Sequence, residues 1–93
     1  MPIKYVIEGH RITGPAAFWQ AVGEAVNGPG GYFGRNRDAF ADCLSGGYGT
    51  PQDGDFTIEW RDHDVSRRAL GTAFFDELVE IMEERAPGAL RLC

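Results

Sequence analysis

The segment FTIEW at residues 56–60 carries the strongest strand signal in the chain. Aromatic and β-branched residues alternate there with polar ones, which is typical of a strand with one buried face. Two further short apolar segments, IKYVIE at 3–8 and ALRLC at 89–93, lie near the two ends of the sequence. We expect these three segments to form the strands of one sheet.

Helical patterns occupy the sequence between these strands. Pro15 suits the first turn of a helix, and the apolar stripe that follows should end near Asn27-Gly28-Pro29. A last helix is expected at 73–85 with Thr72 as its cap, and residues 64–69 carry a weaker helical signal. Residues 28–34 and 47–55 are rich in turn formers and are expected to be loops.

The order of these elements predicts the fold class. Parallel strands need long crossovers, and here helices separate each strand from the next. We therefore predict an α/β fold, with a small three-stranded parallel sheet flanked by about four helices. A chain of 93 residues is expected to form a single domain, spanning 1–93.

Charge and cysteine content narrow the functional classes. Fourteen acidic residues against nine basic ones give a net charge of −5, which argues against direct nucleic-acid binding. No stretch approaches the ~20 apolar residues of a membrane span. Without a visible signal peptide and with only Cys43 and Cys93, we expect free thiols and a cytoplasmic location. The sequence shows no ligand spacing for a metal and no cofactor motif, so neither is expected.

The segment GYFGRNRDAFADCLSGG at 31–47 reads as a glycine loop followed by a short helix. Asn36 is a good N-cap, and Gly46-Gly47 should end the helix. On a helical wheel Asp38 and Asp42 share one side, about 40° apart, while the apolar arc with Phe40 and Leu44 faces away. Like charges one turn apart repel slightly. The pair is either a solvated polar face or a partner-binding surface.

The glycine loop before this helix and the acids of the last helix can likewise be structural or functional. The glycine loop lacks both phosphate-binding spacings, and Asp38 directly after it would repel a phosphate. We expect one of Tyr32 and Phe33 to pack inward and the other to be exposed. The acids of the last helix, among them Glu80 and Glu84, also fit a simple solvated face.

The segments YFGRNRDAFADCLSG at 32–46, FTIEWRD at 56–62 and FDELVEIMEER at 75–85 together resemble the barstar family, the intracellular inhibitors of guanyl-specific bacterial ribonucleases. The resemblance spans nearly the whole chain, and its first motif is specific. It implies an inhibitor without enzymatic activity, whose partner is a secreted-type guanyl-specific ribonuclease with a cationic active site. It also implies partner-binding roles for Tyr32, Asn36, Asp38, Ala41, Asp42, Gly46 and Glu84.

Within that resemblance, Asp42 matches the family's central carboxylate and would enter the catalytic site. Asp38 matches a flanking acid and Tyr32 a contact tyrosine. Glu84 matches the acid of the last helix, although a shift of one residue selects Glu83. Ala41 departs from the family pattern, because a tryptophan can stand there.

Two other interpretations stay open from the sequence. The acidic face could serve a binding or immunity module for a different basic toxin or cellular partner. Alternatively, Asp62 beside His63 could perform general acid–base work, although the sequence shows no nucleophile–base pair to support an enzyme.

Overall fold

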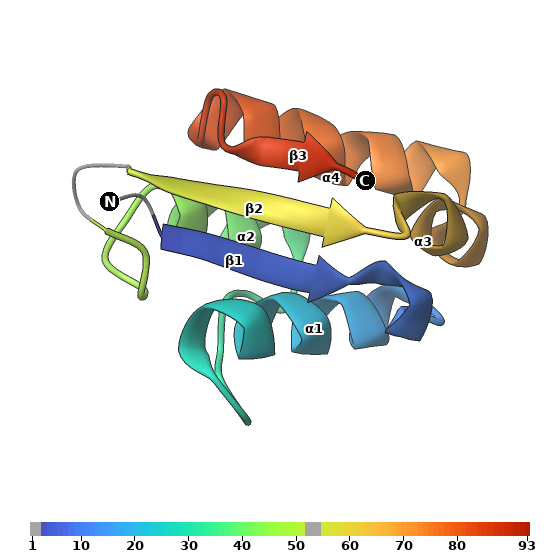
Figure 1. Ribbon diagram of the computed structural model, residues 1–93, viewed down its shortest axis with the longest axis horizontal. Helices are drawn as coiled ribbons and strands as arrows, with labels where there is room; N and C mark the ends of the chain where they lie inside the picture. Colours follow the sequence, from blue (N-terminus) through green and yellow to red (C-terminus); the bar gives the residue numbers. More distant parts are fainter. Residues whose placement is uncertain (1–2, 52–54) are drawn as a thin grey trace.

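The computed structural model describes residues 3–51 and 55–93, and these residues form the predicted α/β fold (Figure 1). Residues 52–54 of the expected second loop lie outside the described residues. The elements follow in the order β1 (Ile3–Glu8), the 3₁₀ helix η1 (Gly9–Arg11), α1 (Pro15–Asn27), α2 (Arg37–Leu44), β2 (Phe56–Arg61), α3 (His63–Leu70), α4 (Thr72–Arg85) and β3 (Leu90–Leu92).

The three strands form one parallel sheet in the order β1-β2-β3. Ile3 of β1 lies opposite Phe56, and Ile58 of β2 lies opposite Leu90. Successive strand side chains point to opposite faces. In β2 this places Phe56, Ile58 and Trp60 in the core and leaves Thr57 and Glu59 half-buried on the other face. The alternation read from the sequence is therefore confirmed.

Helices cover the apolar face of the sheet. Figure 1 shows α1 beside β1, α4 beside β3, and α2 behind the sheet. Phe18 of α1 is central to the core, with its ring centroid 5.6 Å from that of Phe40 and 5.2 Å from that of Trp60. Trp60 in turn lies 5.0 Å from Phe75 of α4. One cluster of aromatic rings thus joins three helices to the central strand.

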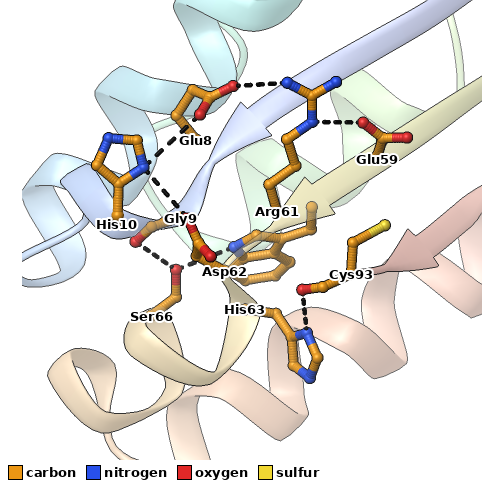
Figure 2. Close-up of polar contacts among 10 residues, drawn as sticks. Glu8, Gly9, His10, Glu59, Arg61, Asp62, His63, Ser66 and Cys93 are labelled. Atoms are coloured by element: carbon orange, nitrogen blue, oxygen red, sulfur yellow. Dashed lines mark hydrogen bonds and ion pairs between the residues drawn. The ribbon is translucent and has the colours of Figure 1, made fainter.

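A buried chain of hydrogen bonds links η1, β2 and α3 at the carboxyl ends of strands β1 and β2 (Figure 2). The indole Nε1 of Trp60 donates to Ser66 Oγ at 3.0 Å, and Ser66 Oγ donates to the Gly9 carbonyl at 2.9 Å. A β-carbon on Gly9 would lie only 2.7 Å from both Ser66 Oγ and the Asp62 carbonyl. The absent side chain at Gly9 therefore allows η1 to pack directly against α3.

The expected boundaries need one correction at the start of α4. Thr72 is not a cap, because Gly71 occupies the N-cap position and Thr72 is the first helical residue. The Gly71 amide closes α3 by donating to Arg67, and the Gly71 carbonyl accepts the amide of Phe75. One glycine with a φ of +87° thus both ends α3 and begins α4, so no loop is left for a capping side chain.

The other boundaries agree with expectation to within two residues. The weak signal at 64–69 corresponds to a complete helix, α3. The last strand is shorter than expected and pairs only at Leu90–Leu92. Within the described residues, no helix is long and apolar enough to cross a membrane.

Candidate partner-binding surface

Helix α2 carries the two aspartates and is fixed at its start by a side-chain cap. Asn36 Oδ1 accepts the amide of Ala39 at 2.8 Å, as the sequence predicted. Phe40 is completely buried and Leu44 nearly so, whereas Asp38 and Asp42 are exposed. Packing of the apolar arc on the core therefore holds both carboxylates toward solvent.

The loop before α2 orients Tyr32 outward. Phe33 is completely buried and packs edge-on against Phe40, with 6.0 Å between the ring centroids. Tyr32 keeps 47% of its surface exposed, so the prediction of one inward and one outward aromatic residue is confirmed. Gly34 follows with a φ of +95°, and a β-carbon there would lie 2.7 Å from the Phe40 amide nitrogen. Glycine at this position lets the loop lie directly against α2.

Helix α4 runs alongside α2 in the same direction. Arg37, the first residue of α2, forms an ion pair with Glu77. Beyond the other end of α2, Arg85 Nη1 donates to Ser45 Oγ at 3.2 Å. The spacing from 37 to 45 equals that from 77 to 85, so the two helices advance together. Glu77 of α4 thereby lies beside the first turn of α2.

This arrangement separates Glu84 from Glu83. On the α4 wheel, Glu84 lies about 20° from Glu77, whose side chain reaches α2, and Glu83 lies about 120° away from it. Both glutamates are exposed. The geometry favours Glu84 as the α4 acid that shares a surface with Asp38 and Asp42.

Ala41 and Gly46 are less exposed to solvent than Asp38 and Asp42. Ala41 is only 8% exposed, and its wheel position between Arg37 and Ser45 turns it toward α4. Gly46, just beyond α2, is half-buried with a φ of +123°. Neither residue presents much surface in the free protein, and their partner contacts stay predictions.

The two aspartates of this surface are exposed and are preceded in the sequence by exposed Arg35 and Arg37. Among the described residues, neither Asp38 nor Asp42 forms an ion pair, whereas Arg37 is engaged by Glu77. The positive charge of Arg37 is therefore directed at Glu77 of α4. Burial raises the pKa of the Cys43 thiol, and the adjacent negative charge of Asp42 raises it further. Two exposed carboxylates on a rigid support can bind a cationic site.

The alternative catalytic pair does not form. His63 Nδ1 lies 2.8 Å from the backbone carbonyl of Cys93, and Asp62 Oδ2 lies 3.4 Å from His10 Nδ1 (Figure 2). The two side chains thus serve separate partners at the end of the sheet. In the part of the chain that the structure describes, no group of three or more His, Cys, Asp or Glu residues could hold a metal.

The model of the family described as Barstar (barnase inhibitor) matches residues 4–89. This chain belongs to the barstar family. Members of the barstar family are inhibitors of barnase-type ribonucleases and not enzymes. A comparison with curated proteins found no match. The resemblance to the barstar family that the sequence motifs indicated is therefore confirmed.

Sequence reasoning missed two contacts around this surface. Glu77 is one of several acids on α4, and nothing in its spacing indicated a bond to Arg37. Asn27 was taken only as a helix end, yet its side chain bonds to two loops. Asn27 adjoins the first glycine loop in the sequence, but Tyr48 lies 21 residues later, so spacing gave no signal for the second bond.

Proposed function

We propose that this barstar-family protein binds a basic, secreted-type guanyl-specific ribonuclease and blocks its active site with helix-borne carboxylates. The observation that carries the proposal is the pair Asp38 and Asp42, exposed and without ion pairs among the described residues, on a helix locked to the core. A ribonuclease site holds cationic groups that bind phosphate and stabilise charge during transfer. Carboxylates inserted there would occupy phosphate positions and exclude the substrate.

Each residue has a distinct part in this proposal. Asp42 enters the catalytic site, where desolvated pairing with cations slows dissociation. Asp38 binds at the rim, and Glu84 adds charge from the neighbouring helix. Tyr32 supplies an aromatic contact beside the acids, because large amphipathic rings are frequent binding anchors. The inhibitor requires no metal or cofactor for this mode of action.

Net charge contributes to association in the same proposal. A chain with a charge of −5 attracts a basic nuclease, which raises the encounter rate at low salt. The barnase–barstar pair is itself the standard example of this steering, so the argument is carried over from the family. We also propose a cytoplasmic location, since the free thiols Cys43 and Cys93 persist in a reducing compartment.

The test is calorimetric titration of barnase with the wild-type protein and single isosteric variants. We expect Asp42→Asn to weaken binding by about 2 kcal/mol or more, as for a central hot spot, and Asp38→Asn by less. Glu84→Gln should weaken binding, whereas Glu83→Gln on the far side of α4 serves as the matched control. Unchanged thermal unfolding of each variant would show that the fold is retained.

Two results would contradict the proposal in different ways. Full-strength binding by Asp42→Asn would refute the proposed site while leaving the ribonuclease partner in place. Failure of the wild-type protein to bind barnase and other guanyl-specific ribonucleases would refute the partner. Recovery of a different basic toxin in a pull-down would then favour the alternative, an immunity module on the same acidic face.

A further inference from the structure

Asn27, the last residue of α1, links two loops that are distant in the sequence. Its Nδ2 donates to the Tyr32 carbonyl at 2.8 Å and to the Tyr48 carbonyl, also at 2.8 Å. A side-chain amide has two N–H groups, and here both are used. The two tyrosines stand on either side of α2, so one side chain ties the segment before this helix to the segment after it.

The backbone of both loops is shaped to approach Asn27. A β-carbon on Gly31, the neighbour of Tyr32, would lie 2.7 Å from Asn27 Cβ. A β-carbon on Gly49, the neighbour of Tyr48, would overlap the Asn27 carboxamide. Each loop therefore carries a glycine beside the tyrosine whose carbonyl accepts the bond. Two independent close approaches show that the contact is built into both loops.

The contact requires the segment after α2 to fold back. Eight helical residues span about 12 Å, so an extended exit would carry Tyr48 away from Tyr32. Two hydrogen bonds from one nitrogen instead keep the carbonyl oxygens within about 6 Å of each other. A weaker bond of 3.4 Å from the Tyr5 hydroxyl to the Gly49 carbonyl anchors the returning segment to β1.

The consequence is a pair of exposed aromatic side chains. Tyr32 and Tyr48 keep 47% and 49% of their surfaces exposed, the highest values among the aromatic residues that the structure describes. Exposed tyrosines on a fixed backbone lose little entropy when they bind, and such rings are frequent anchors. Tyr32 already belongs to the proposed ribonuclease surface, beside the acids of α2.

We infer that Asn27 is a positioning residue, which holds Tyr32 and Tyr48 as a joint aromatic contact for the ribonuclease. The inference rests on the proposed function and extends its surface to the loop after α2. Asn27 itself does not need to touch the partner. Its role is to fix both tyrosine backbones before binding, so that ordering the loops does not reduce the affinity.

The first test uses the free protein and requires no partner. We expect Asn27→Ala to shift the carbonyl ¹³C resonances of both Tyr32 and Tyr48 in NMR spectra. Gln20→Ala is the matched control, because it removes an exposed amide side chain from the same helix. A change at only one tyrosine, or at neither, would refute the link between the loops.

The second test is a double-mutant cycle for barnase binding. Tyr32→Ala and Tyr48→Ala should each weaken binding roughly tenfold, and their combined effect should be non-additive. In the Asn27→Ala background the coupling between the two tyrosines should disappear, while thermal unfolding shows that the variant remains folded at the temperature of the binding assay. A purely structural role of Asn27 would instead leave the coupling intact.

The outcomes separate this inference from the proposed function. Additive effects of the two tyrosines, or full affinity of Asn27→Ala, would overturn the positioning role even if Asp42→Asn behaves as proposed. Absence of barnase binding by the wild-type protein would refute the joint contact together with the partner. The carbonyl resonances would still decide whether Asn27 joins the two loops.

Discussion

Cys43 and Cys93 illustrate how one residue type acquires different properties from its surroundings. Cys43 lies on the inner side of α2 and is 1% exposed, whereas Cys93 is exposed after β3. Burial raises the pKa of the Cys43 thiol, and the charge of Asp42 adds to this effect. Since the thiolate is the reactive form, both causes make Cys43 unreactive in the folded protein.

We therefore expect one fast-reacting thiol per native molecule. With a disulfide reagent at about pH 8, Cys93 should react quickly and Cys43 only as the protein unfolds. Counting released chromophore before and after addition of denaturant checks this. The Cys93→Ser variant should lose the fast phase and keep the slow one. Equal rates for the two thiols in native buffer would contradict the burial of Cys43.

At the scale of elements, the position of α2 determines the proposed surface. This helix has only eight residues, too few to be stable alone in water. Its support comes from the Asn36 cap, the buried rings of Phe33 and Phe40, and the ion pair between Arg37 and Glu77. The exposed ion pair contributes little, at most about 1 kcal/mol, so the cap and the core dominate.

Loss of the cap should be measurable directly. We expect Asn36→Ala to lower the free energy of unfolding by about 1 kcal/mol, because the amide of Ala39 loses its acceptor. Urea denaturation followed by tryptophan fluorescence provides the measurement. Asn36→Ser, which retains an acceptor oxygen, should preserve most of the stability. Equal losses for both variants would mean that the side-chain bond does not stabilise α2.

At the scale of the whole molecule, charges are distributed unequally between the faces. The surface of α2 keeps Asp38 and Asp42 without ion pairs among the described residues, whereas acids on the helix-free face of the sheet are paired. Arg61 Nε donates to Glu59 at 2.6 Å, and Arg61 also lies 3.4 Å from Glu8 (Figure 2). Cations on the sheet face thus pair with its acids, whereas Asp38 and Asp42 on α2 have no such ion-pair partners among the described residues.

These pairs make stability depend on pH. The hydrogen bond from Arg61 holds the pKa of Glu59 below its usual value, and burial opposes this only in part. A lowered pKa in the folded state contributes stability above the ordinary glutamate pKa of about 4.3. That contribution is lost as the pH falls through the lower, folded-state value.

We accordingly expect acid to destabilise the wild-type protein more than Glu59→Gln. Thermal unfolding midpoints measured from about pH 6 down to about pH 3 should converge between the two proteins as the carboxylate protonates. Glu80→Gln on the exposed side of α4 is the control and should follow the wild-type curve. Parallel curves for Glu59→Gln and the wild-type protein would rule out the role of this carboxylate.

Much of the fold was predictable because its signals are local. The alternation in FTIEW, the Asn36 cap and the inward and outward members of the Tyr32-Phe33 pair depend on near neighbours in the sequence. Thr72 was assigned wrongly for the same reason. Threonine is a good cap in isolation, but Gly71 joins two helices so closely that no capping position remains.

By itself, the sequence determined that Asp38 and Asp42 face away from the core. Helical periodicity sets angles around a helix's own axis, and Phe40 and Leu44 occupy the opposite arc. The tertiary structure alone decided that α4 lies beside α2, that Glu77 pairs with Arg37, and that Asn27 joins two loops. Helical periodicity does not indicate which helices will lie side by side, because that arrangement depends on how all the apolar faces pack together.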